Sequence, residues 1–171
     1  MNMKKTRNFW KVKKSKIHGA GVFATKNIPK NTRIIQYVGE KVLRAEGDRR
    51  SEKRLKQYLN SEDDGSVYIF ELNSKYDIDG SPNYNKARYI NHSCRPNCEV
   101  NIDNNEIWIT SIKGIKAHEE LSYDYGFEFD KNDYKDHICK CDQKNCIGYI
   151  ISSDDWSKYL NFIKKIIKQK K

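Results

Sequence analysis

Short apolar runs separated by turn residues dominate the first two thirds of the chain. Alternating β-branched and aromatic residues predict strands, and Pro, Asn and Gly mark the turns between them. The runs that predict strands are residues 9–12, 33–38, 67–72 and 108–112. A hairpin is expected over residues 102–107, because Asp-Asn-Asn lies there between β-branched residues.

Two segments follow the helical period instead. Residues 43–60 are highly charged and carry Leu55, Tyr58 and Leu59 on one face, which predicts a surface helix. Residues 156–168 have apolar side chains on one face and lysines on the other, which predicts an amphipathic helix. Many short strands, few helices and no strand–helix alternation predict a single, mostly β domain for the 171 residues.

The charge is strongly positive, with a net value of +10 and lysines concentrated in residues 4–16 and 164–171. This indicates either contact with a polyanion such as nucleic acid or a lysine-rich composition that serves solubility. A basic protein substrate would need an acidic groove, for which the chain offers Glu71, Asp77, Asp79, Glu128 and Asp130. The acidic run at residues 62–64 is expected in a solvated loop.

The chain contains no apolar run of the length that a membrane span requires, so we expect no membrane contact. The basic N-terminus is not followed by an apolar stretch, so no secretory signal is expected either. Five cysteines in such a chain indicate an intracellular, reducing compartment.

Three cysteines near the C-terminus, Cys139, Cys141 and Cys146, have the spacing of ligands to one tetrahedral metal ion. A structural zinc site takes four ligands, and the fourth would come from Cys94 or Cys98. If Cys94 is that ligand, one zinc ion ties the C-terminus to a distant loop, and Cys98 stays a free thiol. The alternative is that all five are ordinary buried cysteines.

The segment Asn91-His92-Ser93-Cys94, with Arg88 before it, resembles the signature of SET-domain lysine methyltransferases. Residues 18–24, 120–125 and 139–150 resemble the family's cofactor loop, its catalytic-tyrosine block and its post-SET zinc element, in the family's order. The resemblance implies a fold of small curled sheets with a pseudoknot-like crossing. The expected layout is a basic lead-in (1–9), the SET domain (10–130), the zinc element (135–150) and a basic C-terminal helix (154–171).

The resemblance also implies the site residues. Tyr125, Tyr37 and Tyr123 would be the catalytic tyrosines, and a tyrosine at position 123 favours mono- or dimethylation. One structural zinc ion would be held by Cys94, Cys139, Cys141 and Cys146. The apolar residues of 147–150 would pack toward the cofactor's adenine. S-adenosylmethionine would be bound by His18, Gly19, Ala20, Gly21, Val22, Arg88, Asn91, His92 and Tyr125.

The leading hypothesis is therefore an S-adenosylmethionine-dependent protein-lysine N-methyltransferase. Its expected substrate is a basic protein, either the histone H3 tail or another lysine-bearing protein, in the nucleus, on chromatin or in a nucleoid. The basic tails would add a nucleic-acid contact. The alternatives are a catalytically weak SET-fold binding module and a zinc-stabilised nucleic-acid-binding protein, whose affinity would fall steeply with salt.

Two positions depart from the family's pattern, Tyr84 and His118, where relatives usually carry glycine. The first is expected to alter only the loop that leads into Arg88. At the second the turn should survive, because histidine tolerates a positive φ better than most residues.

Overall fold

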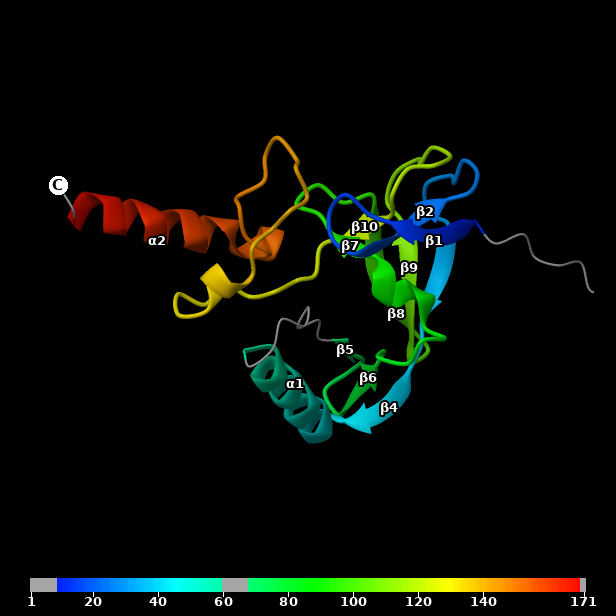
Figure 1. The fold of residues 1–171 in the computed structure, drawn as a ribbon, viewed down its shortest axis with the longest axis horizontal. Helices are drawn as coiled ribbons and strands as arrows, with labels where there is room; N and C mark the ends of the chain where they lie inside the picture. The colour runs from blue at the N-terminus through cyan, green and yellow to red at the C-terminus, as the bar shows by residue number, and fades with distance from the viewer. Residues whose placement is uncertain (1–8, 60–67, 170–171) are drawn as a thin grey trace, which may run out of the picture.

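The computed structural model describes residues 9–59 and 68–169, and these form four small sheets, two α-helices and three short 3-10 helices. Figure 1 shows the strands gathered in one body, with α2 extending away from it. The strands are β1 (Trp10–Lys14), β2 (Ala20–Ala24), β3 (Arg33–Tyr37), β4 (Glu40–Leu43), β5 (Ile69–Glu71), β6 (Tyr76–Asp79), β7 (Asn91–His92), β8 (Cys98–Asp103), β9 (Glu106–Ser111) and β10 (Ser122–Tyr123). The helices are α1 (Arg44–Leu59), η1 (Lys86–Tyr89), η2 (Tyr134–Asp136), η3 (Ser153–Asp155) and α2 (Trp156–Gln169).

The N-terminal sheet pairs β1 with β2 in antiparallel register. Most of the expected cofactor loop is therefore a strand, and only the turn at Gly19, with φ of 44°, departs from extended geometry. Val22 and Ala24 are fully buried, and their alternation with Phe23 is the period of a half-buried strand. This alternation is not visible in the sequence, because Gly19 and Gly21 have no side chains that would mark a position as apolar or polar.

The central sheet has the order β3-β9-β8, with all pairs antiparallel. The predicted hairpin is confirmed, and it joins β8 to β9 through Asn104 and Asn105, with φ values of 50° and 60°. Two consecutive left-handed residues match the twist of the flanking strands, and Asn tolerates that conformation. Ile107 and Ile109 of β9 are buried in the main apolar core.

A third sheet has the order β4-β6-β5, and the charged helix α1 packs beside it. The helix is confirmed, although the side chains of Tyr58 and Leu59 lie outside the described residues, as do Val67 and the acidic run 62–64. Arg50 forms ion pairs with Glu40 and Asp79, and Arg44 pairs with Glu71. These contacts fix α1 against the sheet.

A parallel pair, β7 with β10, links the signature segment to the tyrosine block. Ser93 N donates to the Tyr123 carbonyl, and Asn97 N donates to the Ser122 carbonyl. Residues 91–97 and 122–123 thus run side by side although they are distant in sequence, which is the expected crossing. Nearby, His118 has φ of 71°, as the sequence predicted for that turn.

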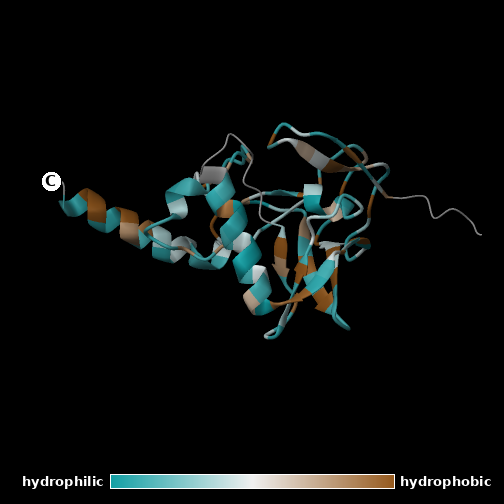
Figure 2. Cartoon of the chain, turned by 60° about the horizontal axis from the view of Figure 1, so that its bottom comes forward, coloured by the Kyte–Doolittle hydropathy of each residue, from teal (hydrophilic) through white to brown (hydrophobic). Residues whose placement is uncertain are grey.

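The C-terminal part has its own apolar cluster, separate from the main core. Tyr134, Ile151 and Tyr159 are buried there, and Phe129 and Phe162 pack against them. Figure 2 shows hydrophobic and hydrophilic stretches alternating along α2, as the predicted amphipathic helix requires. Within the described residues, no helix combines the length and apolar character that crossing a bilayer demands.

Candidate active site

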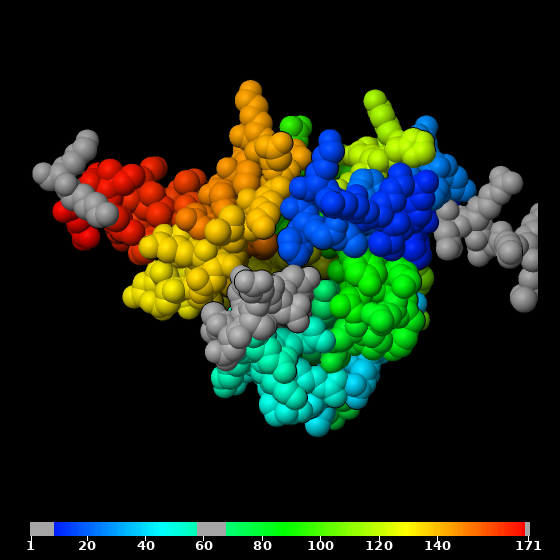
Figure 3. All heavy atoms as spheres, viewed as in Figure 1, coloured from blue at the N-terminus to red at the C-terminus, as the bar shows by residue number. Residues whose placement is uncertain are grey.

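A cavity of about 470 Å³ lies where the N-terminal turn, the crossing and the C-terminal segment meet. Figure 3 shows the surface hollowed between the blue N-terminal residues and the yellow segment after the crossing. Its volume is within the range of sites that bind small molecules and cofactors. Its wall includes the three tyrosines that the sequence singled out, Tyr37, Tyr123 and Tyr125.

The three tyrosines form one aromatic group. The ring centroids of Tyr123 and Tyr125 lie 5.1 Å apart. The Tyr125 hydroxyl donates to the Ile90 carbonyl at 3.0 Å, and the Tyr37 hydroxyl donates to the Tyr68 carbonyl at 2.9 Å. Burial raises the pKa of all three tyrosines, so each hydroxyl is neutral at physiological pH.

Several aromatic residues that the sequence did not single out also line the cavity. Phe70 lies between the tyrosines, with its ring 5.2 Å from Tyr37 and 6.3 Å from Tyr123. The ring of Phe127 lies 5.8 Å from that of Tyr125, in a tilted arrangement. Tyr68 and Phe70 belong to a predicted strand, but nothing in an alternating pattern shows which face meets a cavity.

Asn91 and His92 lie at the crossing, and both are buried and line the cavity. The Asn91 side-chain amide donates to the carbonyls of His18 and Ala20. His92 Nδ1 accepts a hydrogen bond from Tyr125 N at 3.2 Å. Burial lowers the pKa of His92 despite the nearby Asp124 carboxylate, so the ring is neutral and can accept that bond.

Arg88 also lines the cavity, and its guanidinium lies 3.8 Å from the centre of the Tyr68 ring. One terminal nitrogen donates to the Ser81 carbonyl. Its Nε is buried, and it has no partner among the described residues. A buried donor without an acceptor is costly, so this atom is a candidate contact for a ligand.

The predicted cofactor residues of the N-terminal segment divide into two groups. His18, Gly19 and Ala20 line the cavity. Gly21 and Val22 do not: Val22 points into the core, and the space beside Gly21 is filled by the Glu120 carboxylate. Gly21 therefore leaves the space that the Glu120 carboxylate occupies, and neither Gly21 nor Val22 lies at the cavity wall.

The expected acidic groove is not formed by the residues proposed for it. Glu71 and Asp79 are paired with arginines of α1, and Asp77 lies against the same helix at Gly47. Neither Glu128 nor Asp130 lines the cavity. Among the described residues, the carboxylate on its wall is Asp136.

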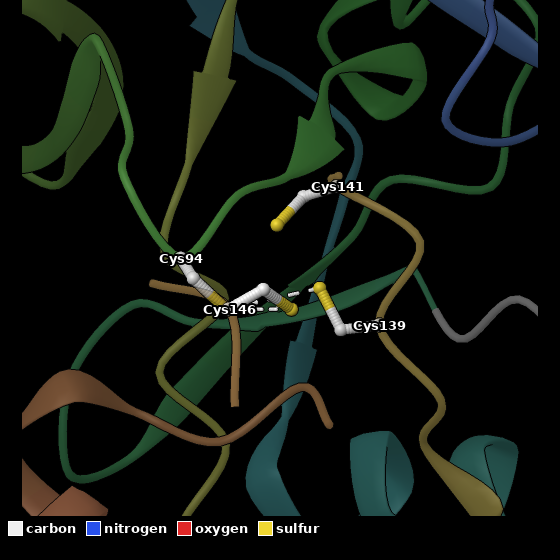
Figure 4. A group of neighbouring side chains, drawn as sticks. All are labelled: Cys94, Cys139, Cys141 and Cys146. Carbon is white, nitrogen blue, oxygen red and sulfur yellow. Dashed lines mark hydrogen bonds between the residues drawn. The ribbon is translucent and has the colours of Figure 1, made fainter. Parts of the chain in front are cut away.

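Figure 4 shows four cysteines converging on one place, and one of them, Cys139, also lines the cavity. The sulfur atoms of Cys94, Cys139, Cys141 and Cys146 all lie within 4.8 Å of one another. Cys94 Sγ is 3.8 Å from Cys139 Sγ and 3.7 Å from Cys146 Sγ. Four thiolates around zinc, each at about 2.3 Å, would have sulfur atoms about 3.8 Å apart, so this group could hold a metal ion of that kind.

Burial raises the pKa of Cys94 to about 12, which disfavours thiolates packed this closely unless a cation neutralises them. Cys98 is separate from the group. It is buried in the main core and donates to the Asn97 side-chain oxygen at 3.4 Å. None of the five cysteines, all within the described residues, forms a disulfide.

The segment after Cys146 meets the cavity at one residue. Ile150 lines the wall, whereas Ile147 and Tyr149 pack in the C-terminal apolar cluster. Of the segment expected to pack toward the cofactor, only Ile150 is therefore at the cavity, because the C-terminal helix region supplies an apolar surface that Ile147 and Tyr149 cover.

The crossing, the tyrosine group and the adjoining cysteines define the class of protein: residues 19–126 match the SET domain family, and the chain belongs to it. It is similar to "Histone-lysine N-methyltransferase, H3 lysine-4 specific" of Chaetomium globosum, with 36% identity over 152 residues. That alignment covers 86% of this chain and 14% of the relative.

Two further relatives show the same relation. "Histone-lysine N-methyltransferase 2D" of Homo sapiens is 35% identical over 151 residues, covering 84% of this chain and 3% of that protein. The H3 lysine-4 specific enzyme of Saccharomyces cerevisiae is 36% identical over 141 residues, covering 80% of this chain and 13% of that protein. The chain thus spans only a small part of these curated relatives. The matched residues 19–126 lie inside the SET segment predicted from the sequence, 10–130.

Proposed function

We propose that this chain is an S-adenosylmethionine-dependent protein-lysine N-methyltransferase. The observation that carries the proposal is the position of Tyr125. Tyr125 lines a cavity whose wall also includes the predicted cofactor residues Asn91, His92 and Arg88, and its hydroxyl is held by the Ile90 carbonyl. A SET fold with this constellation has both a place for a methyl donor and an aromatic wall for a lysine side chain.

The residues that would hold the cofactor are His18, Gly19, Ala20, Arg88, Asn91 and His92. Arg88 Nε supplies a buried donor, and the amide of Asn91 is fixed by the backbone of the N-terminal turn. When bound, S-adenosylmethionine supplies an electrophilic methyl group on a positively charged sulfur. The aromatic side chains and neutral hydroxyls around it exclude water and carry no charge that competes with this group.

The lysine substrate must reach the cavity as a neutral amine, although its ordinary pKa is near 10.4. An apolar channel disfavours the ammonium form and lowers that pKa. The neutral amine would then take up the methyl group that bound S-adenosylmethionine supplies, with S-adenosylhomocysteine as the leaving group, and the methylated ammonium could release its proton to solvent. We assign no carboxylate base, so the protein's contribution is orientation and desolvation.

The proposal is tested by transfer of labelled methyl groups from S-adenosylmethionine to a panel of histones and other basic proteins. Label on a lysine side chain establishes the activity and names the substrate class. Cofactor binding without label on any substrate would favour the alternative of a binding module. Failure to bind the cofactor would contradict the proposal.

We further propose that the cysteine group holds one structural zinc ion. Four sulfur ligands leave no open position, which is the pattern of a structural rather than a catalytic zinc site. The ion would join the end of the signature segment, at Cys94, to the C-terminal segment that carries His137, Ile138 and Ile150 to the cavity.

Histone H3 is the substrate that we propose first, because the most similar relatives include enzymes named for lysine 4 of that protein. A nuclear, chromatin-associated location follows from the same argument. Ile138 and Leu55 line the cavity and are 63% and 45% exposed, so residues that flank the target lysine would meet an apolar rim.

Replacing Tyr123 with Phe is expected to raise the number of methyl groups added to one lysine. Tyr123 lines the cavity, and its hydroxyl makes no hydrogen bond to any described residue, so it can hold a water molecule where a larger product would need space. Wild type should produce mono- and dimethyllysine, and the variant should produce trimethyllysine, as measured by mass spectrometry of the peptide. Efficient trimethylation by wild type would contradict this prediction.

Nucleic-acid contact is proposed for the lysine-rich ends, of which residues 1–8 and 170–171 lie outside the described residues. Lys164, Lys165 and Lys168 of α2 are exposed and form no ion pair with any described residue. Changing these three to Gln should weaken binding to duplex DNA and reduce the slope of log affinity against log salt by about 3. Changing Lys41, Lys75 and Lys86 removes equal charge elsewhere and should leave the slope unchanged.

A further inference from the structure

The carboxylate of Glu120 joins three segments behind the cavity wall, although Glu120 itself does not line that cavity. We propose that Glu120 is a positioning residue, which sets the orientation of the Asn91 side-chain amide and of the turn at residues 15–20. The inference rests on the proposed function in one respect, namely that Asn91 is a cofactor contact.

The contacts of Asn91 account for both hydrogens of its amide group. Its Nδ2 lies 2.8 Å from Glu120 Oε1, 3.1 Å from the Ala20 carbonyl and 3.3 Å from the His18 carbonyl. One hydrogen therefore goes to the carboxylate, and the two carbonyls share the other. All three partners are acceptors, so the amide nitrogen must face them.

This arrangement decides which atom of Asn91 is available to a ligand. A carboxylate can only accept hydrogen bonds, so it cannot pair with the amide oxygen of a flipped Asn91. Oδ1 is consequently the free atom of this amide at the cavity wall. S-adenosylmethionine carries an ammonium group, and an acceptor held in a fixed orientation suits such a donor.

The same carboxylate holds the adjoining turn. The Ser15 hydroxyl donates to Glu120 at 2.7 Å from Oε1, and Ile17 N donates to that hydroxyl. Ser15 N also donates to the Gly19 carbonyl. The residues of this turn form one wall of the cavity, so Glu120 fixes that wall without touching what lies inside.

The space beside Gly21 is a second observation that supports the inference, because the same carboxylate occupies it. A Cβ atom at residue 21 would overlap Glu120 Oε1 and meet Ser15 Cβ at 3.0 Å. Gly21 is thus the residue that leaves space for the carboxylate next to Asn91.

Glu120→Gln is the direct test, with Glu119→Gln as its matched control. A glutamine at 120 can present an NH₂ group to Asn91 and permit the flipped amide. Glu119 undergoes the same chemical change but bonds Asn97 and Lys116 N instead. Titration calorimetry should show about tenfold weaker binding of S-adenosylmethionine to Glu120→Gln and unchanged binding to Glu119→Gln.

Kinetics separate positioning from general damage. In Glu120→Gln the KM for S-adenosylmethionine should rise by about the same factor, while kcat changes less than twofold and the melting temperature stays near that of wild type. Equal cofactor affinity in Glu120→Gln and wild type would overturn the inference. So would a fall in kcat with KM unchanged.

Two measurements do not depend on the proposed function. In wild type, the Asn91 side-chain amide protons should exchange slowly with solvent by NMR, and in Glu120→Ala they should exchange rapidly. Gly21→Ala should speed this exchange, whereas adding it to Glu120→Ala should change the exchange little further, because the overlap with the carboxylate is then gone and only the contact with Ser15 Cβ at 3.0 Å remains. Fast exchange in wild type would overturn the inference, while slow exchange in a protein that binds no cofactor would contradict only the proposed function.

Discussion

Tyr125→Phe should reduce methyl transfer roughly 100-fold, the size of effect expected when reacting groups lose their orientation. The hydroxyl donates to the Ile90 carbonyl, which fixes its oxygen at one place in the cavity. That oxygen is the polar group that we expect beside the transferring methyl and the amine. The measurement is label transfer at saturating cofactor and peptide.

Cofactor binding should survive in Tyr125→Phe, because the ring still packs against His92 and Tyr123 and the backbone N–H still donates to His92. Tyr134→Phe is a suitable control. Tyr134 is also buried, but it lies in the C-terminal apolar cluster away from the cavity wall. If Tyr125→Phe retains more than half of the wild-type rate, the proposed role of this hydroxyl is wrong.

Removing the metal should abolish activity and unfold the C-terminal segment before the rest of the protein. A structural zinc site contributes roughly 10–16 kcal/mol of apparent binding free energy, and this energy stabilises whatever the metal closes. Here the proposed ion would close the contact between Cys94 and the segment that brings His137, Ile138 and Ile150 to the cavity. The main apolar core is formed largely by residues of the strands and includes none of the four cysteines of the proposed site, so its packing does not depend on the metal.

Cys139→Ser should therefore lose bound zinc, which elemental analysis measures as a change from about one ion per chain to none. Hydrogen exchange should then show lost protection after residue 127 and retained protection in β3, β8 and β9. Cys98→Ser is the control, because Cys98 is a buried cysteine outside the group. Full activity in metal-free protein would contradict the prediction.

Local patterns were sufficient to predict the elements whose residues alternate or repeat clearly. The β8–β9 hairpin and both α-helices have such patterns, and the structure confirms them. The patterns were insufficient for β4 and β6. In β4 the charged residues Glu40 and Lys41 are exposed, whereas in β6 the acids Asp77 and Asp79 are buried, and a buried acid looks like a loop residue in sequence. Asp79 becomes acceptable in the sheet because α1 supplies Arg50 as its ion-pair partner.

The sequence by itself indicated the family, the three C-terminal cysteines of the group and the aromatic residues of the blocks, because these depend on residue types at fixed spacings, whereas the structure placed Cys94 rather than Cys98 beside those three cysteines. Only the tertiary structure decided which atoms meet. It placed Glu71 and Asp79 against α1 instead of a groove, moved Gly21 and Val22 away from the cavity, and brought Tyr68 and Phe70 to its wall. Contacts between residues far apart in the chain follow from how sheets and helices pack, and no local spacing contains that information.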